Sequence, residues 1–178
     1  MTDELLVKGC LRGDPRRQQA LYEKYKVGMF MVCLRYAVNR AEAEDFLQDG
    51  FMQVFRDLHQ FDPQKGTLHA WVRRIMVNTA LQHLRKKRVA FADADVSVFA
   101  DRAPIEEDII SMLSAKEIVQ LIQQLPEGYK VVFNLFMVEG YSHQEIAGLL
   151  GISENTSKTQ LRKARLSLQQ KVVDLVSA

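Results

Sequence analysis

The sequence predicts an all-α fold made of two small helical domains joined by an acidic linker. Three observations lead to this prediction. Apolar residues recur every three or four positions along most of the chain, strand-like alternation is nearly absent, and residues 89–108 interrupt the periodicity with acids and a proline. Of the 178 residues, 47% are hydrophobic, which is enough for a buried core. The predicted boundaries are 1–90 for the first domain, 91–110 for the linker and 111–178 for the second domain.

In the first domain the sequence predicts four helices, which cover roughly residues 5–10, 15–36, 40–59 and 67–87. Asp14 followed by Pro15 is typical of an N-cap and a first helical position. Asn39 with Glu42 three residues later resembles a second cap. The segment FDPQKGT, residues 61–67, contains a proline and a glycine and is predicted to be a loop.

In the second domain the predicted helices cover about 109–124 and 127–138, and two further helices follow a turn at Gly140 and Tyr141. Ser142 and Glu145 form the S-x-x-E pattern of a capping box. Gly151 stands where a left-handed residue ends a helix, and Ser153 caps the last helix. In the linker, four apolar residues predict that it docks on a surface: Phe91, Val96, Val98 and Phe99.

Charge is distributed unevenly along a chain whose net charge is only +2. Residues 39–62 hold six acids and two bases, whereas 71–88 hold six bases and no acid. Residues 89–111 hold six acids and one base, and 154–171 hold five bases and one acid. Segments of opposite sign indicate surfaces for different partners.

Several classes of protein are disfavoured by the composition. Cys10 and Cys33 form no C-x-x-C pair, which argues against a disulfide scaffold or a zinc site and favours a cytoplasmic location. No signal peptide and no run of about 20 apolar residues is visible, so membrane insertion is not expected. The four histidines lack ligand spacing and no glycine-rich phosphate loop is present. We therefore expect no cofactor and no catalysis by this chain.

The C-terminal segment YSHQEIAGLLGISENTSKTQLRKAR, residues 141–165, is typical of a helix-turn-helix. At 100° per residue, the last helix gathers an apolar stripe on one side and a polar, cationic side near its start. Such a helix suits the major groove of DNA, where Arg and Lys meet guanine edges and phosphates and Asn meets adenine. The alternative is a solvated cationic face on a helical hairpin. The apolar stripe consists of Leu161, Ala164, Leu168, Val172 and Leu175.

The fourth predicted helix carries a polar stripe between two apolar strips. This stripe ends in the basic run RKKR, residues 85–88, and is suited to following a nucleic-acid strand. The loop 61–67 directly before it has an aromatic and a flexible glycine, features that suit an unstacked base. We expect Trp71 to be a core residue. The stripe consists of Arg74, Asn78, Gln82 and Arg85.

The third predicted helix, AEAEDFLQDGFMQVFRDL, has a core side and a separate acidic side. The acidic side does not suit DNA but suits a protein that carries arginines. Taken alone, the pattern fits an ordinary solvated helix exterior better than a partner surface. Its exposed polar residues are expected to be Glu44, Asp45, Gln48 and Asp49.

Together these segments resemble the extracytoplasmic-function (ECF) group of the sigma-70 family, the promoter-recognition subunits of bacterial RNA polymerase. The third helix resembles the family's polymerase-binding helix, residues 61–88 its −10 loop and helix, and residues 125–165 its −35-binding domain. The order of the three segments, with an acidic linker between them, is highly specific for the family. The resemblance implies two partners, core RNA polymerase and promoter DNA that is double-stranded at −35 and melted at −10.

The resemblance also implies roles for individual residues. Polymerase contacts are assigned to Asp45, Gln48 and Asp49. Contacts with the −10 element are assigned to Phe61, Lys65, Gly66, Thr67, Arg74, Asn78, Gln82 and Arg85. Contacts with the −35 element are assigned to Asn155, Thr156, Lys158, Thr159, Arg162 and Lys163. The linker is expected to run toward the RNA exit path, and an anti-sigma factor is a further candidate partner.

Two positions depart from the family pattern. Gly50 stands where the family usually has a larger residue, and we expect it to loosen the third helix. Ser157 replaces a frequent valine in the recognition helix and points toward the apolar stripe, so its hydroxyl is expected to be satisfied locally.

Two other functions fit part of the sequence. A free-standing transcriptional regulator would use the same helix-turn-helix and bind a palindromic site without polymerase. The combination of acidic helix, loop and basic stripe in the first domain argues against it. An enzyme is the second alternative, and the absence of ligand spacing among His59, His69, His83 and His143 argues against that.

Overall fold

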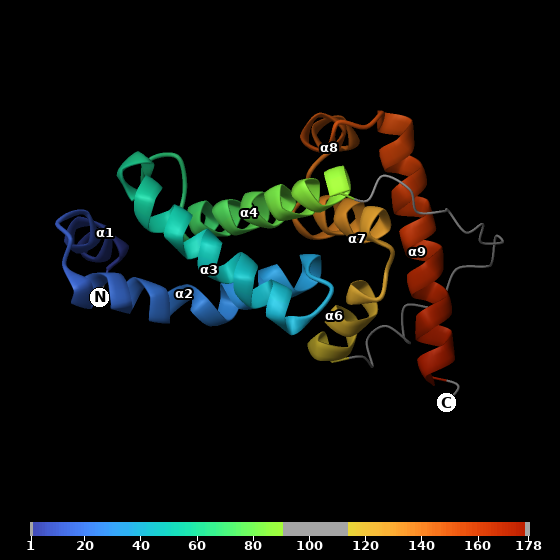
Figure 1. Cartoon of the computed structure of the whole chain (residues 1–178), viewed down its shortest axis with the longest axis horizontal. Helices are drawn as coiled ribbons and strands as arrows, with labels where there is room; N and C mark the ends of the chain where they lie inside the picture. The colour runs from blue at the N-terminus through green and yellow to red at the C-terminus, as the bar shows by residue number, and fades with distance from the viewer. Residues whose placement is uncertain (1, 91–113, 177–178) are drawn as a thin grey trace. The chain divides into compact units, whose positions relative to one another are not determined.

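The structure, a computed structural model, describes residues 2–90 and 114–176 (Figure 1). The described residues are mostly helical and belong to two compact units, one on each side of residues 91–113. The all-α, two-domain prediction is therefore confirmed. The predicted docking of the linker concerns residues that lie outside the described part of the chain.

The N-terminal unit contains α1 (Asp3–Leu11), α2 (Pro15–Tyr36), α3 (Arg40–Asp57), the short 3₁₀ helix η1 (Leu58–Gln60) and α4 (Leu68–Ala90). The predicted caps are confirmed. Asp14 accepts a hydrogen bond from the Arg16 amide at 2.9 Å, and Asn39 accepts one from the Glu42 amide at 2.9 Å. The Glu42 carboxylate in turn accepts from the Val38 amide at 2.7 Å.

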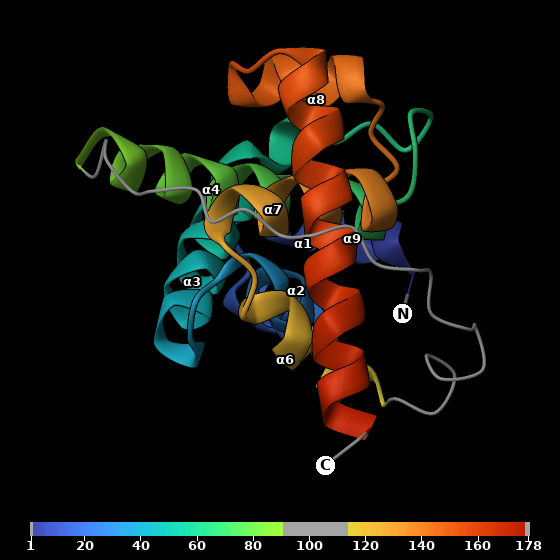
Figure 2. The ribbon, with the colours of Figure 1, turned by 90° about the vertical axis from the view of Figure 1, so that its right-hand side faces the viewer.

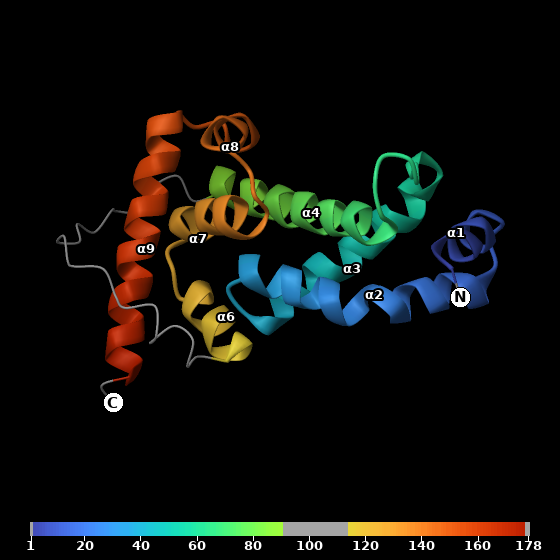
Figure 3. The same cartoon turned by 180° about the vertical axis from the view of Figure 1, so that it is seen from behind.

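Three of these helices, α2, α3 and α4, pack against one another as a bundle (Figure 3). Helix α1 packs on α2 and on η1, at the end of the bundle where the loop 61–67 also lies. The bundle core contains fully buried large side chains, among them Tyr36, Phe46 and Met76.

The structure gives a packing role to Gly50, one of the two departures from the family pattern. Gly50 is buried in the middle of α3, and a Cβ atom there would collide with the Sδ atom of Met76 from α4. The glycine therefore makes room for the Met76 side chain, which is itself fully buried. At this position the small residue serves the packing of two helices.

The C-terminal unit contains α6 (Ala115–Gln123), α7 (Glu127–Phe133), the π-helical turn η2 (Asn134–Val138), α8 (His143–Leu150) and α9 (Glu154–Val176). Helices α6, α7 and α8 all pack against α9. Figure 2 shows α8 at its N-terminal end, α7 beside its middle and α6 farther toward its C-terminus. The core includes Leu125, Tyr129 and Ala164, with Phe133 and Leu168 packed against them.

Three details of this unit differ from the predictions. Ser114 has an extended backbone and forms a capping box with Glu117, so α6 begins at Ala115, and the predicted start near Ile109 lies outside the described residues. The predicted helix 127–138 ends in a π turn, in which the Glu139 amide bonds to the Asn134 carbonyl, five residues back. Leu175, expected in the apolar stripe, is 44% exposed.

No helix in residues 2–90 and 114–176 combines the length and the apolar character that a bilayer crossing requires.

Candidate nucleic-acid interfaces and the acidic face of α3

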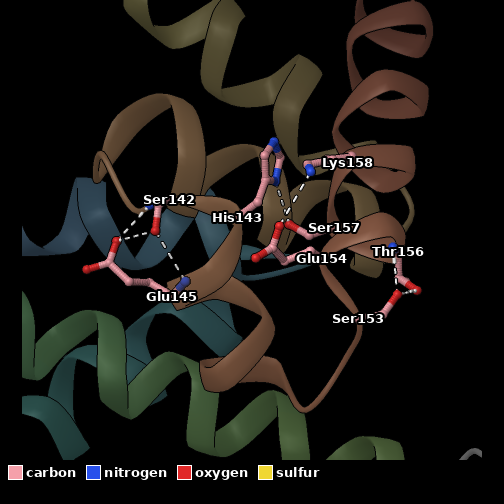
Figure 4. Close-up of polar contacts among 8 residues, drawn as sticks. All are labelled: Ser142, His143, Glu145, Ser153, Glu154, Thr156, Ser157 and Lys158. Carbon is pink, nitrogen blue, oxygen red and sulfur yellow. Dashed lines mark hydrogen bonds and ion pairs between the residues drawn. The ribbon is translucent and has the colours of Figure 1, made fainter.

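Helix α8 is capped at both ends as predicted, and a short turn joins it to α9. The Ser142 hydroxyl accepts from the Glu145 amide at 3.2 Å, while Glu145 accepts from the Ser142 amide at 2.8 Å (Figure 4). The Ser142 hydroxyl also donates to the Glu145 carboxylate at 2.8 Å, and the two hydrogen bonds that this carboxylate accepts, first from the amide and then from the hydroxyl, lower the pKa of Glu145. At the other end Gly151 adopts a left-handed backbone with φ of 67°, which terminates α8. The turn geometry is that of a helix-turn-helix.

The first turn of α9 is also organised by a cap. The Ser153 hydroxyl accepts from the Thr156 amide at 3.0 Å, and the two hydroxyls lie 2.9 Å apart (Figure 4). Lys158 pairs with Glu154 at 3.4 Å one turn apart. The Thr156 side chain therefore takes part in the cap of the helix in addition to being exposed.

The residues predicted to meet the −35 element lie together on the first turns of α9. All are exposed except Lys163, which is half-buried. The opposite side of the same turns is buried through Ser157, Leu161 and Ala164. The helix therefore presents one polar, cationic face, consisting of Asn155, Thr156, Lys158, Thr159, Arg162 and Lys163.

Ser157 has a partner that the sequence did not reveal. The side chain is 0% exposed, and its hydroxyl lies 2.8 Å from Nδ1 of His143, the first residue of α8 (Figure 4). The His143 ring also stacks on Phe136 of η2, with 4.4 Å between ring centroids. The expectation of a local partner is therefore wrong, because the hydroxyl is satisfied across two helices. The contact links the recognition helix to the helix that precedes it.

In the N-terminal unit the loop 61–67 is an ordered turn. The Asp62 carboxylate accepts from the Gln64 amide at 2.9 Å, and the Asp62 carbonyl accepts from the Lys65 amide at 3.1 Å. Gly66 has φ of 152°, a backbone conformation that residues with a side chain rarely adopt. Thr67 then caps α4 by accepting from the Ala70 amide at 3.2 Å.

A hollow of about 300 Å³ lies between this loop and the first turns of α4. Two half-buried aromatic rings form part of it, and Phe61 and Trp71 meet edge to face with centroids 5.7 Å apart. Trp71 is only half-buried, so the prediction that it is a core residue is wrong. An aromatic wall with a cation nearby suits a flat, unstacked base. The residues that line the hollow are Gln60, Phe61, Asp62, Lys65, Gly66, Thr67, Ala70, Trp71 and Arg74.

The predicted −10 residues divide into two groups. Phe61, Lys65, Gly66, Thr67 and Arg74 line the hollow, while Asn78, Gln82 and Arg85 do not. The second group is exposed along the same side of α4 and begins one helical turn beyond Arg74. The structure therefore brings the loop residues together and places the others on a track that leads away from the hollow.

On α3, the three residues predicted to bind polymerase are exposed on one side of the helix. Asp49 also contacts α4, with its Oδ2 atom 2.7 Å from Nε2 of His83. Met52 is 66% exposed and stands seven residues after Asp45, on the same side of the helix. The sequence carried a signal for Met52, a large apolar residue at heptad spacing from an acidic one, but none for the contact with His83.

Two family models match the chain. Residues 21–89 match "Sigma-70 region 2" and residues 115–168 match "Sigma-70, region 4". The first match contains the acidic face, the hollow and the track on α4, and the second contains the helix-turn-helix. Together they cover most of the chain, and both regions belong to one family.

Curated relatives match along nearly the whole length. The ECF RNA polymerase sigma factor SigW of Bacillus subtilis is 28% identical, covering 95% of this chain and 96% of the relative. The RNA polymerase sigma-H factor of Pseudomonas aeruginosa is 29% identical, with 98% and 95% covered. A solved structure of the sigma factor RpoE in complex with the anti-sigma factor NepR from Bartonella quintana has a similar fold. Its TM-score is 0.51 at 20% identity, covering 88% of this chain and 98% of that chain.

The ECF resemblance inferred from the sequence is thereby confirmed. The two matched regions, the full-length relatives and the helical fold of both units show that the chain belongs to the sigma-70 family, in the group of ECF RNA polymerase sigma factors.

Proposed function

We propose that this sigma factor binds core RNA polymerase through the exposed face of α3 and directs it to promoters that its two units read separately. The start of α9 reads the double-stranded −35 element. The hollow beside the loop 61–67 holds a base of the melted −10 element, and the track on α4 follows the same strand. The chain itself catalyses no reaction, and it acts in the cytoplasm, where its partners are.

The observation that carries this proposal is that each unit exposes one cationic helix face, and each face falls inside a matched sigma-70 region. On α9 this face includes Lys158 and Arg162, and on α4 it includes Arg74 and Arg85. Cationic faces of this kind bind phosphates and make binding weaker at high salt. A free-standing regulator that binds DNA through one helix-turn-helix would need only the C-terminal face.

Recognition at −35 follows from the shape of the C-terminal unit. The first turns of α9 are exposed on one side and held by buried residues on the other, so the helix can enter a major groove. In this proposal Arg162 and Lys163 meet base edges or phosphates. Asn155 and Thr159 provide shorter polar groups nearby.

Recognition at −10 follows from the hollow in the N-terminal unit. A base that has left the duplex loses its stacking partners, and Phe61 and Trp71 offer it a new aromatic surface. Lys65, at the rim, and Arg74, on the first turns of α4, supply positive charge for the backbone of the captured strand. Asn78 and Gln82 contact nucleotides next to the captured base in this arrangement, because they lie outside the hollow.

Polymerase binding follows from the composition of the α3 face. Asp45, Gln48 and Asp49 supply acceptors for a basic partner, and Met52 supplies an apolar contact on the same side. Interfaces commonly place an apolar side chain among polar ones in this way. We further propose that an anti-sigma factor covers the α3 face in the free protein. A bound anti-sigma factor and core polymerase should then exclude each other.

The test is run-off transcription with purified core polymerase on four templates, in which the −35 and −10 elements are each intact or scrambled. We expect specific transcripts only when the protein is added and both elements are intact. A gel-shift assay without core polymerase is the matched control. Tight, specific binding of the free chain to a palindromic site would support the free-standing regulator instead.

A further inference from the structure

The contact between Asp49 and His83 joins the proposed polymerase face to the neighbouring helix. The atoms Oδ2 of Asp49 and Nε2 of His83 are 2.7 Å apart, although the residues are separated by 34 positions in the chain. The Asp49 side chain is 53% exposed and the His83 side chain 29% exposed. The carboxylate is therefore held from one side and open to solvent on the other.

His83 is itself held in place. Its ring packs on the buried Phe46 of α3, with 5.0 Å between the ring centroids. A ring packed in this way has few orientations, and Nε2 is directed at the carboxylate in the one observed. Because a carboxylate has about four acceptor positions, one bond from His83 leaves the others available for a partner's arginine or lysine.

Asp45, one turn earlier on α3, provides a natural comparison. It is exposed, and its side chain has no hydrogen-bond partner among residues 2–90 and 114–176. A side chain of this kind loses rotational freedom when a partner binds, and that loss weakens binding. Asp49 has already lost much of this freedom before any partner arrives.

We propose that His83 is a positioning residue for polymerase binding, which holds the Asp49 carboxylate in the orientation that the polymerase meets. The proposal rests on the function proposed above for the α3 face. Its effect is indirect, since His83 touches Asp49 and Phe46 and acts through them. Removing the hydrogen bond from His83 should weaken the complex only as long as Asp49 is present.

The experiment measures the dissociation constant for core RNA polymerase with the full chain and two His83 variants. His83→Phe keeps a ring against Phe46 but cannot donate to Asp49. His83→Gln places an amide donor at a similar distance. We expect His83→Phe to weaken binding roughly threefold to tenfold, the cost of ordering one side chain, and His83→Gln to restore most of the affinity.

The same His83→Phe substitution is then made in the background of Asp49→Ala. If His83 acts by positioning Asp49, the second substitution has no further effect, because the group to be positioned is gone. Thermal unfolding of each variant is recorded alongside. An equal loss of affinity in both backgrounds would show that His83→Phe acts through the fold, and would overturn the proposal.

Two other results are informative. If Asp49→Ala weakens binding but His83→Phe does not, the positioning role is overturned while the α3 face keeps its proposed function. If neither Asp45→Ala nor Asp49→Ala changes the affinity, the proposed function of the acidic residues fails, and the positioning role fails with it.

Discussion

The two regions proposed to bind DNA differ in shape, and the difference matches the form of DNA that the proposal assigns to each. The start of α9 is a projecting helix whose polar residues point outward. The loop 61–67 and the first turns of α4 instead surround a hollow of about 300 Å³ with two aromatic rings. A projecting helix reads base edges in the groove of a duplex, whereas a hollow receives a base that has left the stack. In the proposed function, similar positive charge therefore serves two kinds of recognition.

The comparison predicts that substitutions at the start of α9 act on the −35 element alone. Replacing both Arg162 and Lys163 with alanine should remove about 1–3 kcal/mol of discrimination for each base edge that these side chains recognise. Transcription from an intact promoter should fall toward the level of a promoter with a scrambled −35 element. The slope of binding against salt should also decrease, because the variant neutralises fewer phosphates. Equal loss of activity on both promoters would contradict this assignment.

The hollow should show the opposite dependence. Phe61→Ala removes one stacking surface and should weaken capture of the melted strand by about 1–3 kcal/mol, with −35 preference unchanged. Fluorescence of a base analogue placed at successive −10 positions reports the captured base.

Exchanging residues 64–67 for a different loop should change which −10 base is preferred. Gln19→Ala, at an exposed position on α2 that is assigned no DNA contact, is the control. An unaltered base preference after the loop exchange, with normal polymerase binding, would show that the loop only connects two helices.

The α3 face is separate from both regions proposed to bind DNA. Substitutions in it should therefore change polymerase binding in the absence of promoter DNA. Met52→Ala should weaken polymerase binding by more than about 1 kcal/mol if Met52 is a central contact. Reversing Asp45 and Asp49 to lysine should weaken it further, because the proposed partner surface is basic. A pull-down with core polymerase measures both effects, and Asp174→Lys, which reverses an exposed acid in the C-terminal unit, serves as the control. Unchanged binding would leave the acidic residues as solvated surface.

A smaller effect is expected inside the helix-turn-helix. Ser157→Ala removes the hydrogen bond to His143 and should lower the free energy of unfolding of the C-terminal unit by about 0.5–1.5 kcal/mol. Chemical denaturation followed by far-ultraviolet circular dichroism measures the change. Unaltered stability would show that the hydrogen bond between Ser157 and His143 contributes nothing measurable to the stability of this unit.

Thiol labelling can measure the opening of the N-terminal unit separately, because both cysteines lie in that unit. Burial raises the pKa of Cys33 to about 12, and it also raises the pKa of Cys10. Since the thiolate is the reactive form, both thiols stay neutral and inert near pH 8 in the folded protein. We expect thiol labelling only at the rate at which this unit opens. Rapid labelling of the native protein would contradict the burial of Cys33.

Much of the fold was visible in the sequence because its signals are local. Asp14, Asn39, Ser142 and Ser153 each cap a helix through residues two or three positions away, and Gly151 ends α8 through its own backbone conformation. The cap at Ser114 was also present in the sequence, as Ser-x-x-Glu, but the apolar pattern upstream of it favoured an earlier start. Interactions of this range depend on neighbouring residues and little else.

The sequence by itself determined the helical fold, the two units, the cationic face of α9 and the acidic face of α3, because helical periodicity dictates which residues share a side. The tertiary structure decided what those sides touch. It placed Met76 over Gly50, His143 on Ser157 and His83 on Asp49, and it separated Asn78 and Gln82 from the hollow. These outcomes depend on how closely helices approach, a distance set by the packing of many side chains that no local pattern contains.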